Sequence, residues 1–293
     1  MSHLPRKFVL YCLAAIVPVA GMLAATAVTA NAQTTMAAVA RPSASAGPEA
    51  LARAAIEKLA IGQHPVNHAV GVVSSPGKPK GLTDVQSTNW SGYADTGSSF
   101  SKVTANWTEP SATCSSRTEQ LAAFWVGIDG YSSNSVEQDG TLIECYEGTA
   151  YQYTWWEMYP TNDIQVVGET LAAGDAITST VTRTGTSYTL TVTDSTHSAN
   201  SFTERESCSS CANTSVEWIA EAPSGSSSIY PLADFGSWTA SGASVTEGST
   251  SGVISSFTDD EITMVDSSSR VKAQPGSLNS SGNSFSVTWE RAS

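Results

Sequence analysis

From residue 88 onward, hydrophobic and polar residues alternate with the period of two that is typical of β-strands. Residues 177–194 contain two alternating runs around Thr-Gly-Thr, which predicts a β-hairpin. Two further runs, at 101–110 and 284–291, alternate in the same way, and no segment of 88–293 has a convincing helical period. The pattern predicts an all-β sandwich of roughly 200 residues, large enough to bury a sizeable core.

The N-terminal region differs from this pattern. Basic residues at 6 and 7 precede an apolar run over 8–25, and Ala-Asn-Ala follows at 30–32. This order predicts a secretory signal peptide at 1–32, with an uncleaved membrane anchor as the alternative. No later apolar run approaches the roughly 20 residues that a spanning helix needs. We therefore expect a secreted, extracellular protein with no membrane association after signal cleavage.

The segment 33–87 contains no Trp, Tyr, Phe or Cys. Residues 48–62 predict a short helix, and residues 74–81 (SSPGKPKG) predict a linker. We interpret 33–87 as a pro-segment that is cleaved near residue 85 and precedes a domain at 88–293. A disordered spacer is the alternative interpretation.

Charge divides at the same place. The segment 33–87 has five basic and three acidic residues, whereas 88–293 has seven Lys and Arg against 24 Asp and Glu, a formal net charge of −17 (7 − 24). Nucleic acid is not an expected partner, because binding its phosphates needs Lys and Arg. The two parts should attract each other at neutral pH, and protonation of carboxylates near pH 4 should weaken that attraction.

Four cysteines remain after signal cleavage, in an oxidising compartment that favours disulfides. We favour the pairs Cys114–Cys145 and Cys208–Cys211, although four cysteines permit other pairings. A thioredoxin-like role for Cys-Ser-Ser-Cys would need a βαβ context, which the pattern lacks. A zinc site is disfavoured because Cys114 and Cys145 are not close in sequence.

Few residue types remain for catalysis in 88–293. The single histidine, His197, lies in a Ser-rich loop and is interpreted as a solvated residue, so neither a His-assisted nucleophile nor a His-based zinc site is indicated. No phosphate-binding loop or dinucleotide fingerprint occurs. An enzyme with this sequence would use carboxylates, amides or hydroxyls.

Two carboxylates stand out in the segment VEWIAEAP, residues 216–223. On a strand, Glu217 and Glu221 would lie on one face, about 13 Å apart at ~3.3 Å per residue. They therefore do not match the pair of a glycosidase, whose carboxyl groups are roughly 5–10 Å apart. We interpret Glu217 as a solvated or hydrogen-bonded strand residue.

Four segments together resemble the eqolisin family of glutamic peptidases. They are NWSGY (89–93), FWVGIDGYSSNSVEQDG (124–140), YTWWEMYP (153–160) and TSVEWIAE (214–221). Each alone is unspecific, but the order and spacing of all four are specific. The resemblance implies a sandwich of two curved antiparallel sheets, similar to the concanavalin and lectin-like jelly roll, and a secreted endopeptidase that works at acid pH.

The resemblance also implies the site residues. Gln138, in the segment EQDG, and Glu221, the second acid of E-W-I-x-E, match the catalytic pair, which activates a water and stabilises the oxyanion. Four further residues match or adjoin supporting and substrate-binding positions: Trp125 and Trp156 as cleft or core residues, and Asp129 and Glu157 as hydrogen-bond partners of the pair or of each other. No metal or cofactor is implied.

The expected partners are protein or peptide substrates and the chain's own pro-segment as an intramolecular inhibitor, and we expect a monomer. The same sandwich also suits a carbohydrate-binding lectin-like module or a glycosidase, in which Trp residues would stack on sugars. Gln138 discriminates among these alternatives, because glycoside hydrolysis has no routine need for an amide.

Overall fold

The computed structural model describes residues 71–73, 83–168, 170–225 and 228–293. The predicted signal peptide, the predicted helix at 48–62 and most of the predicted linker lie outside the described residues. The described residues all belong to one compact unit, Pro42–Ser293. Within these ranges no helix is long and apolar enough to span a membrane.

The described part consists of β-strands joined by loops and two short 3-10 helices, η2 and η3. The bounds of these elements are β1 Gly71–Val73, β2 Thr83–Ser87, β3 Trp90–Thr96, β4 Phe100–Thr108, β5 Gln120–Ile128, β6 Val136–Tyr146, β7 Thr149–Tyr159, β8 Asn162–Gly168, β9 Ala176–Thr184, β10 Ser187–Asp194, η2 Ser198–Asn200, β11 Phe202–Ser207, β12 Ser215–Glu221, β13 Ser237–Glu247, β14 Thr250–Gly252, η3 Ile254–Ser256, β15 Thr258–Val265, β16 Val271–Pro275 and β17 Phe285–Trp289.

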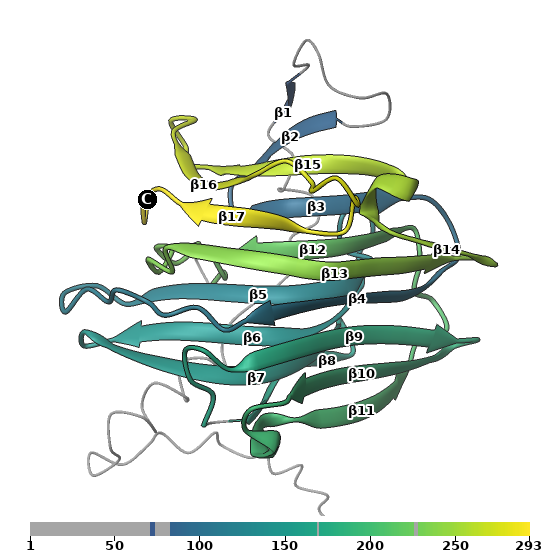
Figure 1. Cartoon of the computed structure of the whole chain (residues 1–293), viewed down its shortest axis with the longest axis horizontal. Coiled ribbons are helices and arrows are strands. Elements are labelled where there is room, and N and C mark those ends of the chain that lie inside the picture. The colour runs from purple at the N-terminus through teal and green to yellow at the C-terminus, as the bar shows by residue number, and fades with distance from the viewer. Residues whose placement is uncertain (1–70, 74–82, 169, 226–227) are drawn as a thin grey trace, which may run out of the picture. The chain divides into compact units, whose positions relative to one another are not determined.

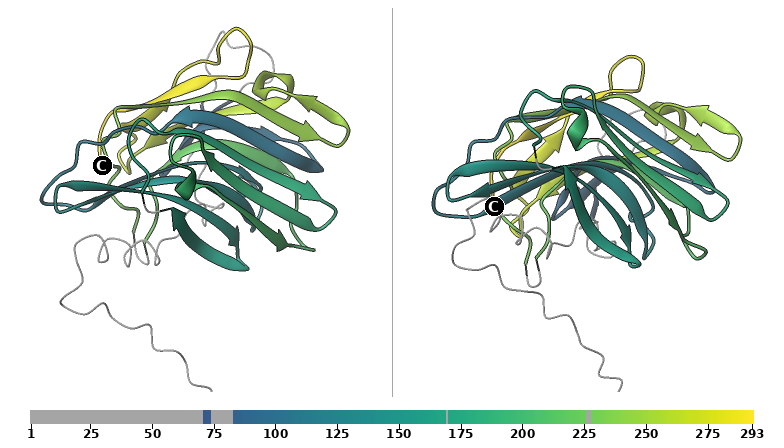
Figure 2. Two further views of the ribbon diagram at one scale, coloured as in Figure 1. Left: turned by 60° about the horizontal axis from the view of Figure 1, so that its bottom comes forward. Right: turned by 90° about the horizontal axis from the view of Figure 1, so that it is seen from below.

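The strands form two layers. One sheet has the order β1-β2-β15-β3-β12-β5-β6-β7-β8, and the other has the order β14-β13-β4-β9-β10-β11 (Figure 1). Strands β16 and β17 connect the two sheets, because β16 pairs with β15 and β17 pairs with β16. Strand β13 then pairs with β17 through Ser237–Ala240 and with β4 through Ser241–Glu247. Figure 2 shows the two layers facing each other. The predicted all-β sandwich of antiparallel sheets is confirmed.

The alternating runs of the sequence form strands as predicted. The run at 177–194 is the β9–β10 hairpin, in which Thr184 pairs with Ser187. Gly185, in the turn between them, has φ 63°, a left-handed conformation that glycine adopts without strain. The runs at 101–110 and 284–291 correspond to β4 and β17.

Two apolar clusters lie on opposite faces of the large sheet. One fills the space between the sheets and includes Trp218 of β12 together with Val103 and Leu190 of the second sheet. The other contains only residues of the large sheet and its loops, among them Trp125 and Ile219, so it lies on the outer face. The alternation along β12 thus separates Trp218 from Ile219, as its period of two predicts.

The large sheet begins before the predicted domain boundary at 88. Strand β2 pairs in parallel with β15, and Val85 of β2 is buried in the outer-face cluster. Strand β1 adds to the free edge of β2. Residues 83–87, which sequence analysis assigns to the pro-segment, are therefore part of the sheet.

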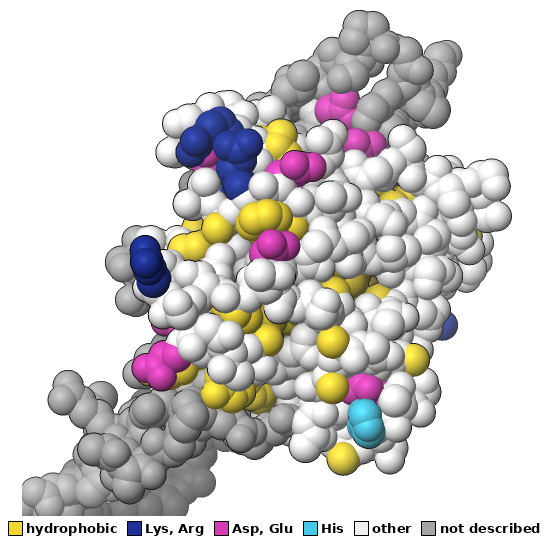
Figure 3. Space-filling model, turned by 60° about the vertical axis from the view of Figure 1, so that its left-hand side comes forward, with side chains coloured by type: hydrophobic (Ala, Val, Ile, Leu, Met, Phe, Trp, Pro, Cys, Tyr) yellow, Lys and Arg dark blue, Asp and Glu magenta, His cyan; other side chains and the backbone are white. Residues whose placement is uncertain are grey.

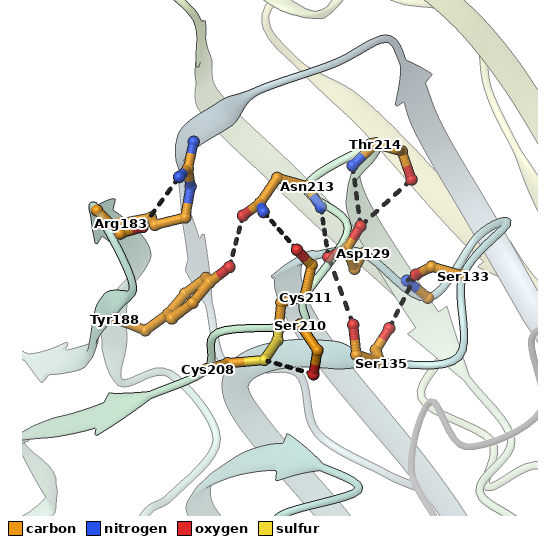
Figure 4. The surroundings of a disulfide bond; sticks show 12 residues. Asp129, Ser133, Ser135, Arg183, Tyr188, Cys208, Ser210, Cys211, Asn213 and Thr214 are labelled. Atoms are coloured by element: carbon orange, nitrogen blue, oxygen red, sulfur yellow. Dashed lines mark hydrogen bonds between the residues drawn. A yellow bond between two sulfur atoms is a disulfide. The ribbon is translucent and has the colours of Figure 1, made fainter. Parts of the chain in front are cut away.

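Both favoured disulfides are present. Cys114–Cys145 joins the segment after β4 to β6, with Cα atoms 5.2 Å apart. Cys208–Cys211 closes a short loop between β11 and β12, with Cα atoms 5.7 Å apart (Figure 4). These pairings exclude a zinc site made from the four thiolates.

Candidate active site

A row of polar residues crosses the outer face of the large sheet. Glu217 of β12 pairs with Gly127 of β5, and Gly127 pairs with Gln138 of β6. Glu157 of β7 continues the row as the partner of Gln138. Directly paired residues point to the same face, so this face carries Glu217, Gln138 and Glu157 together, and Glu221 also, four residues further along β12.

The carboxylate of Glu221 is buried and held by two N–H donors. Asn89 Nδ2 donates to Oε1 at 3.2 Å, and Trp125 Nε1 donates to Oε2 at 3.0 Å. Asn89 is oriented in turn by Ser87, whose hydroxyl donates to Asn89 Oδ1 at 3.3 Å. Hydrogen bonds to an ionised group are the strong ones, so this arrangement suits a carboxylate rather than a neutral acid.

Two glycines, one on β5 and one on β6, leave room for the side chain of Trp125. An added Cβ at Gly127 would lie 2.9 Å from Trp125 Cζ3 and 3.2 Å from the Cβ of Gln138. An added Cβ at Gly140, the β6 partner of Trp125, would lie 2.0 Å from a carbonyl oxygen of β5. Trp90 packs edge-on against Trp125, with ring centroids 5.0 Å apart. The benzene edge of the indole therefore lies over Gly127, beside Gln138, and its N–H reaches Glu221.

Glu157 fixes the orientation of Gln138. Gln138 Nε2 donates to Glu157 Oε2 at 2.6 Å, and both side chains are buried. Pairing of adjacent strands makes this contact possible, because Gln138 and Glu157 are direct partners of β6 and β7. Of the two contacts predicted for Glu157, the structure contains the hydrogen bond to a member of the candidate pair, Gln138.

Gln138 and Glu221 are separated by the register. They lie two strands apart, about 10 Å across the sheet, and four residues apart along it, about 13 Å. Both side chains point to the outer face, with the Trp125 ring between their rows. This offset requires a substrate and a water to lie between the two groups if they act together.

Asp129 serves the neighbouring loop rather than the pair. Its carboxylate accepts hydrogen bonds from the backbone N–H groups of Asn213 at 2.7 Å and Thr214 at 2.9 Å (Figure 4). Asp129 has φ 68°, and its own N–H donates to the carbonyl of Ser215. It thus ties the end of β5 to the segment between Cys211 and β12.

Trp156 lies on the opposite face from the candidate pair. It belongs to the cluster between the sheets and is 8% exposed. The alternation of β7 is the reason, because Trp155 and Glu157 share the outer face and Trp156 must point inward. Trp156 is a core residue, and Trp155 occupies the outer-face position beside Gly140.

Of the two interpretations of Glu217, a solvated or a hydrogen-bonded strand residue, the structure excludes the solvated one. Glu217 is fully buried, and burial raises its pKa well above the usual range. The apolar neighbours on both sides of each acid in VEWIAEAP were a signal of this burial. Asn89 was also missed, because a single Asn before Trp90 has no chemical pattern that distinguishes it from a loop residue.

Burial of acids is general in this protein. More than half of the 24 acidic residues of 88–293 are buried: Asp95, Glu109, Asp129, Glu137, Asp139, Glu144, Glu157, Asp175, Asp194, Glu217, Glu221, Asp259 and Glu261. On the face shown in Figure 3, charged side chains are scattered singly or in small groups among neutral ones. Much of the formal negative charge of 88–293 therefore belongs to carboxyl groups inside the fold.

Among the described residues, two groups of side chains have the composition of a metal site. Asp175, Asp194 and His197 lie close together, but their carboxylates already accept protein donors, including His197 Nδ1 at 2.9 Å from Asp175 Oδ1. The second group contains Cys208 and Cys211, which form a disulfide. His197 is 54% exposed, so it is partly solvated as expected and also paired with Asp175.

The chain is similar to known peptidases in sequence and in structure. The family model described as the peptidase A4 family matches residues 88–289. Aspergillopepsin-2 of Aspergillus niger is 31% identical over 198 residues, covering 58% of this chain and 69% of that protein. Scytalidopepsin B of Scytalidium lignicola is 31% identical over 159 residues, covering 52% of this chain and 59% of that protein.

Two solved structures have the same fold. Scytalido-glutamic peptidase, in complex with a peptide-based transition state analog, superposes with a TM-score of 0.59 and 25% identity over 69% of this chain and 98% of that chain. Aspergilloglutamic peptidase from Aspergillus niger has a TM-score of 0.50 and 29% identity over 58% of this chain and 99% of that chain. Because the family model spans most of the chain, the protein belongs to the peptidase A4, or eqolisin, family of glutamic endopeptidases.

Proposed function

We propose that the protein is a secreted acid endopeptidase in which Gln138 and Glu221 hydrolyse peptide bonds together. The observation that carries the proposal is the shared face of the two residues: they project from β6 and β12 to the outer face, each held by other buried polar side chains. The relatives are named as peptidases, and one was solved with a peptide-based transition state analog.

The proposed reaction begins with Glu221 as general base. Its carboxylate removes a proton from a water, whose oxygen attacks the carbonyl carbon of the scissile peptide bond. The carbonyl oxygen becomes an oxyanion, to which an N–H of Gln138 donates. Protonated Glu221 then gives its proton to the leaving nitrogen as the C–N bond breaks. This restores the carboxylate and yields one carboxyl and one amine product.

The side chains around the pair have distinct roles in this proposal. Glu157 holds the Gln138 amide through the 2.6 Å hydrogen bond, so the amide is oriented before substrate arrives. Asn89 and Trp125 hold both oxygens of Glu221. The proposed reaction needs no metal or cofactor, because Glu221 supplies the base and Gln138 supplies the hydrogen-bond donor.

Hydrolysis of a denatured protein substrate across pH tests the proposal. Protein comprising residues 33–293 is incubated with denatured globin from about pH 2 to about pH 7, beside Glu221→Gln and Gln138→Ala. We expect wild-type hydrolysis at acid pH and loss in both variants, with circular dichroism showing that each variant is folded. Hydrolysis by Glu221→Gln at the wild-type rate would refute the assignment of the base.

We further propose that residues 1–32 direct secretion and that 33–87 is an inhibitory pro-segment of a monomeric enzyme. The opposite charges of 33–87 and 88–293 support binding at neutral pH and release in acid. Strand β2 bears on how the pro-segment is removed. Because β2 pairs with β15, we propose that cleavage near residue 85 requires β2 to leave the sheet.

A further inference from the structure

Glu217 is the acid of β12 that lies in the same row as Gln138. Only Gly127 separates them in the register, so their Cα atoms are about 10 Å apart across the sheet. Glu221 is displaced along the strands as well. Because Gly127 has no side chain, the space between Glu217 and Gln138 is occupied on the β5 side by the edge of the Trp125 ring.

The surroundings of Glu217 favour its neutral form. Neither carboxyl oxygen has a well-formed hydrogen bond to a described residue, and the side chain is fully buried. Burial is the largest cause that raises its pKa well above the usual range. The groups that act on it are the Ser215 hydroxyl of its own strand, the Tyr131 backbone, and the carboxyls of Asp129 at the end of β5 and Glu137 of β6.

Other groups near Glu217 are also acidic or neutral. Tyr131, in the loop after β5, donates its hydroxyl hydrogen to Asp260 of β15 at 2.7 Å. On the β3 side, Glu217 pairs with Ala94, and on the far side of Gln138 lies Glu157. Among the described residues, a negative charge on Glu217 would therefore have acidic neighbours and no compensating cation.

Such a charge would oppose the reaction at Gln138. The proposed mechanism develops an oxyanion beside the Gln138 amide, and a second negative charge in the same row would repel it in a water-poor site. In the neutral form, Glu217 exerts no such repulsion. Its protonation state thus affects the transition state without any contact with the reacting atoms.

We propose that Glu217 is a positioning residue that must be protonated for hydrolysis, and that its ionisation sets the upper pH limit of activity. This inference rests on the proposed function of Gln138 and Glu221. It separates two acids of one strand by their roles: Glu221 must be ionised to accept a proton, whereas Glu217 must remain neutral. In the pH profile of activity, ionisation of Glu221 would then produce the rise at low pH, and ionisation of Glu217 would produce the fall at higher pH.

The test is the pH profile of kcat/KM for Glu217→Gln, whose amide mimics the neutral acid and cannot ionise. Processed enzyme is assayed on a soluble peptide substrate from about pH 2 to about pH 9. We expect wild-type rates in acid and an upper limb moved by at least about one pH unit, which is about a tenfold gain on that limb. A merely structural role would not move this limb while the protein stays folded.

Glu144→Gln is the matched control. Like Glu217, Glu144 is a buried acid on the outer face, but it belongs to β6 and lies six residues from Gln138. Burial raises its pKa to about 8. We expect its upper limb to coincide with that of the wild type. The melting temperature of each variant is measured at every assay pH, so that unfolding is not mistaken for titration. If Glu217→Gln does not fold, Glu217→Leu provides a second neutral side chain of similar size.

The outcomes separate this inference from the proposed function. An upper limb of Glu217→Gln that coincides with the wild type would overturn the inference. Loss of activity at acid pH in a folded Glu217→Gln would also overturn it, because the carboxyl group itself would then be required. Both results leave the pair intact if Glu221→Gln is inactive, whereas an active Glu221→Gln would refute the pair.

Discussion

The indole N–H of Trp125 donates a 3.0 Å hydrogen bond to Glu221, while the benzene edge of the same ring lies over Gly127, beside Gln138. One rigid side chain therefore contacts both rows that carry the candidate pair. The tryptophan of the WVGID segment, which sequence analysis placed in the cleft or core, has a polar role as well as a packing role.

Replacement of Trp125 by Phe tests the polar role. The ring remains, but the donor to Glu221 Oε2 is lost. Loss of a hydrogen bond to a charged group costs about 1.5–3 kcal/mol, so we expect kcat/KM to fall roughly 10–100-fold.

Trp155→Phe is the matched control for this change. Trp155 lies in the same row and outer-face cluster, and its indole N–H has no hydrogen-bond partner among the described residues. Equal losses in the two variants would show that packing of the rings, and not the bond to Glu221, determines activity.

Asp129 should matter for stability more than for catalysis. Asp129→Asn keeps a side chain that tolerates positive φ but weakens two charge-assisted hydrogen bonds to the backbone of residues 213 and 214. We expect the free energy of unfolding to fall by about 2–4 kcal/mol, measured by urea denaturation, with kcat/KM of the folded enzyme little changed. A catalytic loss without a loss of stability would place Asp129 in the catalytic machinery instead.

Stability should decrease from mildly acid pH toward neutrality. Burial raises the pKa of Asp95 to about 9 and of Glu109 to about 8. Because these groups ionise near pH 4 in the unfolded chain, only the unfolded state releases their protons between about pH 4 and 8. The free energy of unfolding should then fall with rising pH, by about 1.4 kcal/mol per pH unit for each group.

Calorimetry from about pH 3 to about pH 8 measures this dependence. Glu109→Gln should flatten it, whereas Glu290→Gln, at an exposed position, should leave it unchanged. Below about pH 4 the trend should reverse in part, since hydrogen bonds from Asn200 and the His197 backbone outweigh burial and lower the pKa of Asp194. A melting temperature that rises steadily to neutral pH would contradict the account.

The pro-segment should leave the domain as pH falls. We expect residues 33–293 to be inactive and of full size at about pH 7, and to be shortened and active after incubation at about pH 3, as followed by mass spectrometry. The acid side chains lose charge near pH 4, which removes the attraction to the basic segment. Full activity of the unshortened chain at neutral pH would contradict an inhibitory role.

The strands and their faces were predictable because alternation depends on residues two apart. The same rule placed Glu217 and Glu221 on one face and, applied to β7, would have placed Trp156 in the core. Pairing between distant strands was not predictable, because no local pattern determines the register. The contacts of Gln138 with Glu157 and of Asp129 with residues 213 and 214 depend on that register.

Burial of acids was the other feature that composition concealed. A charge of −17 suggests an acidic surface, yet most of the carboxyls are inside. Burial depends on which strand faces are covered, and this property belongs to the assembled sheets. The resemblance in four segments indicated the candidate pair, but it gave no catalytic role to Asn89 or Glu217, which the folded structure brings to the candidate site.

A double-mutant cycle tests most directly whether Gln138 and Glu221 act as one unit. Single-turnover rates are measured at acid pH for Gln138→Ala, Glu221→Gln and the double variant, each shown to be folded. If both residues act on the same transition state, the double variant should be little slower than the slower single variant. Losses that multiply, or a Glu221→Gln variant as fast as the wild type, would contradict a Gln138–Glu221 catalytic pair.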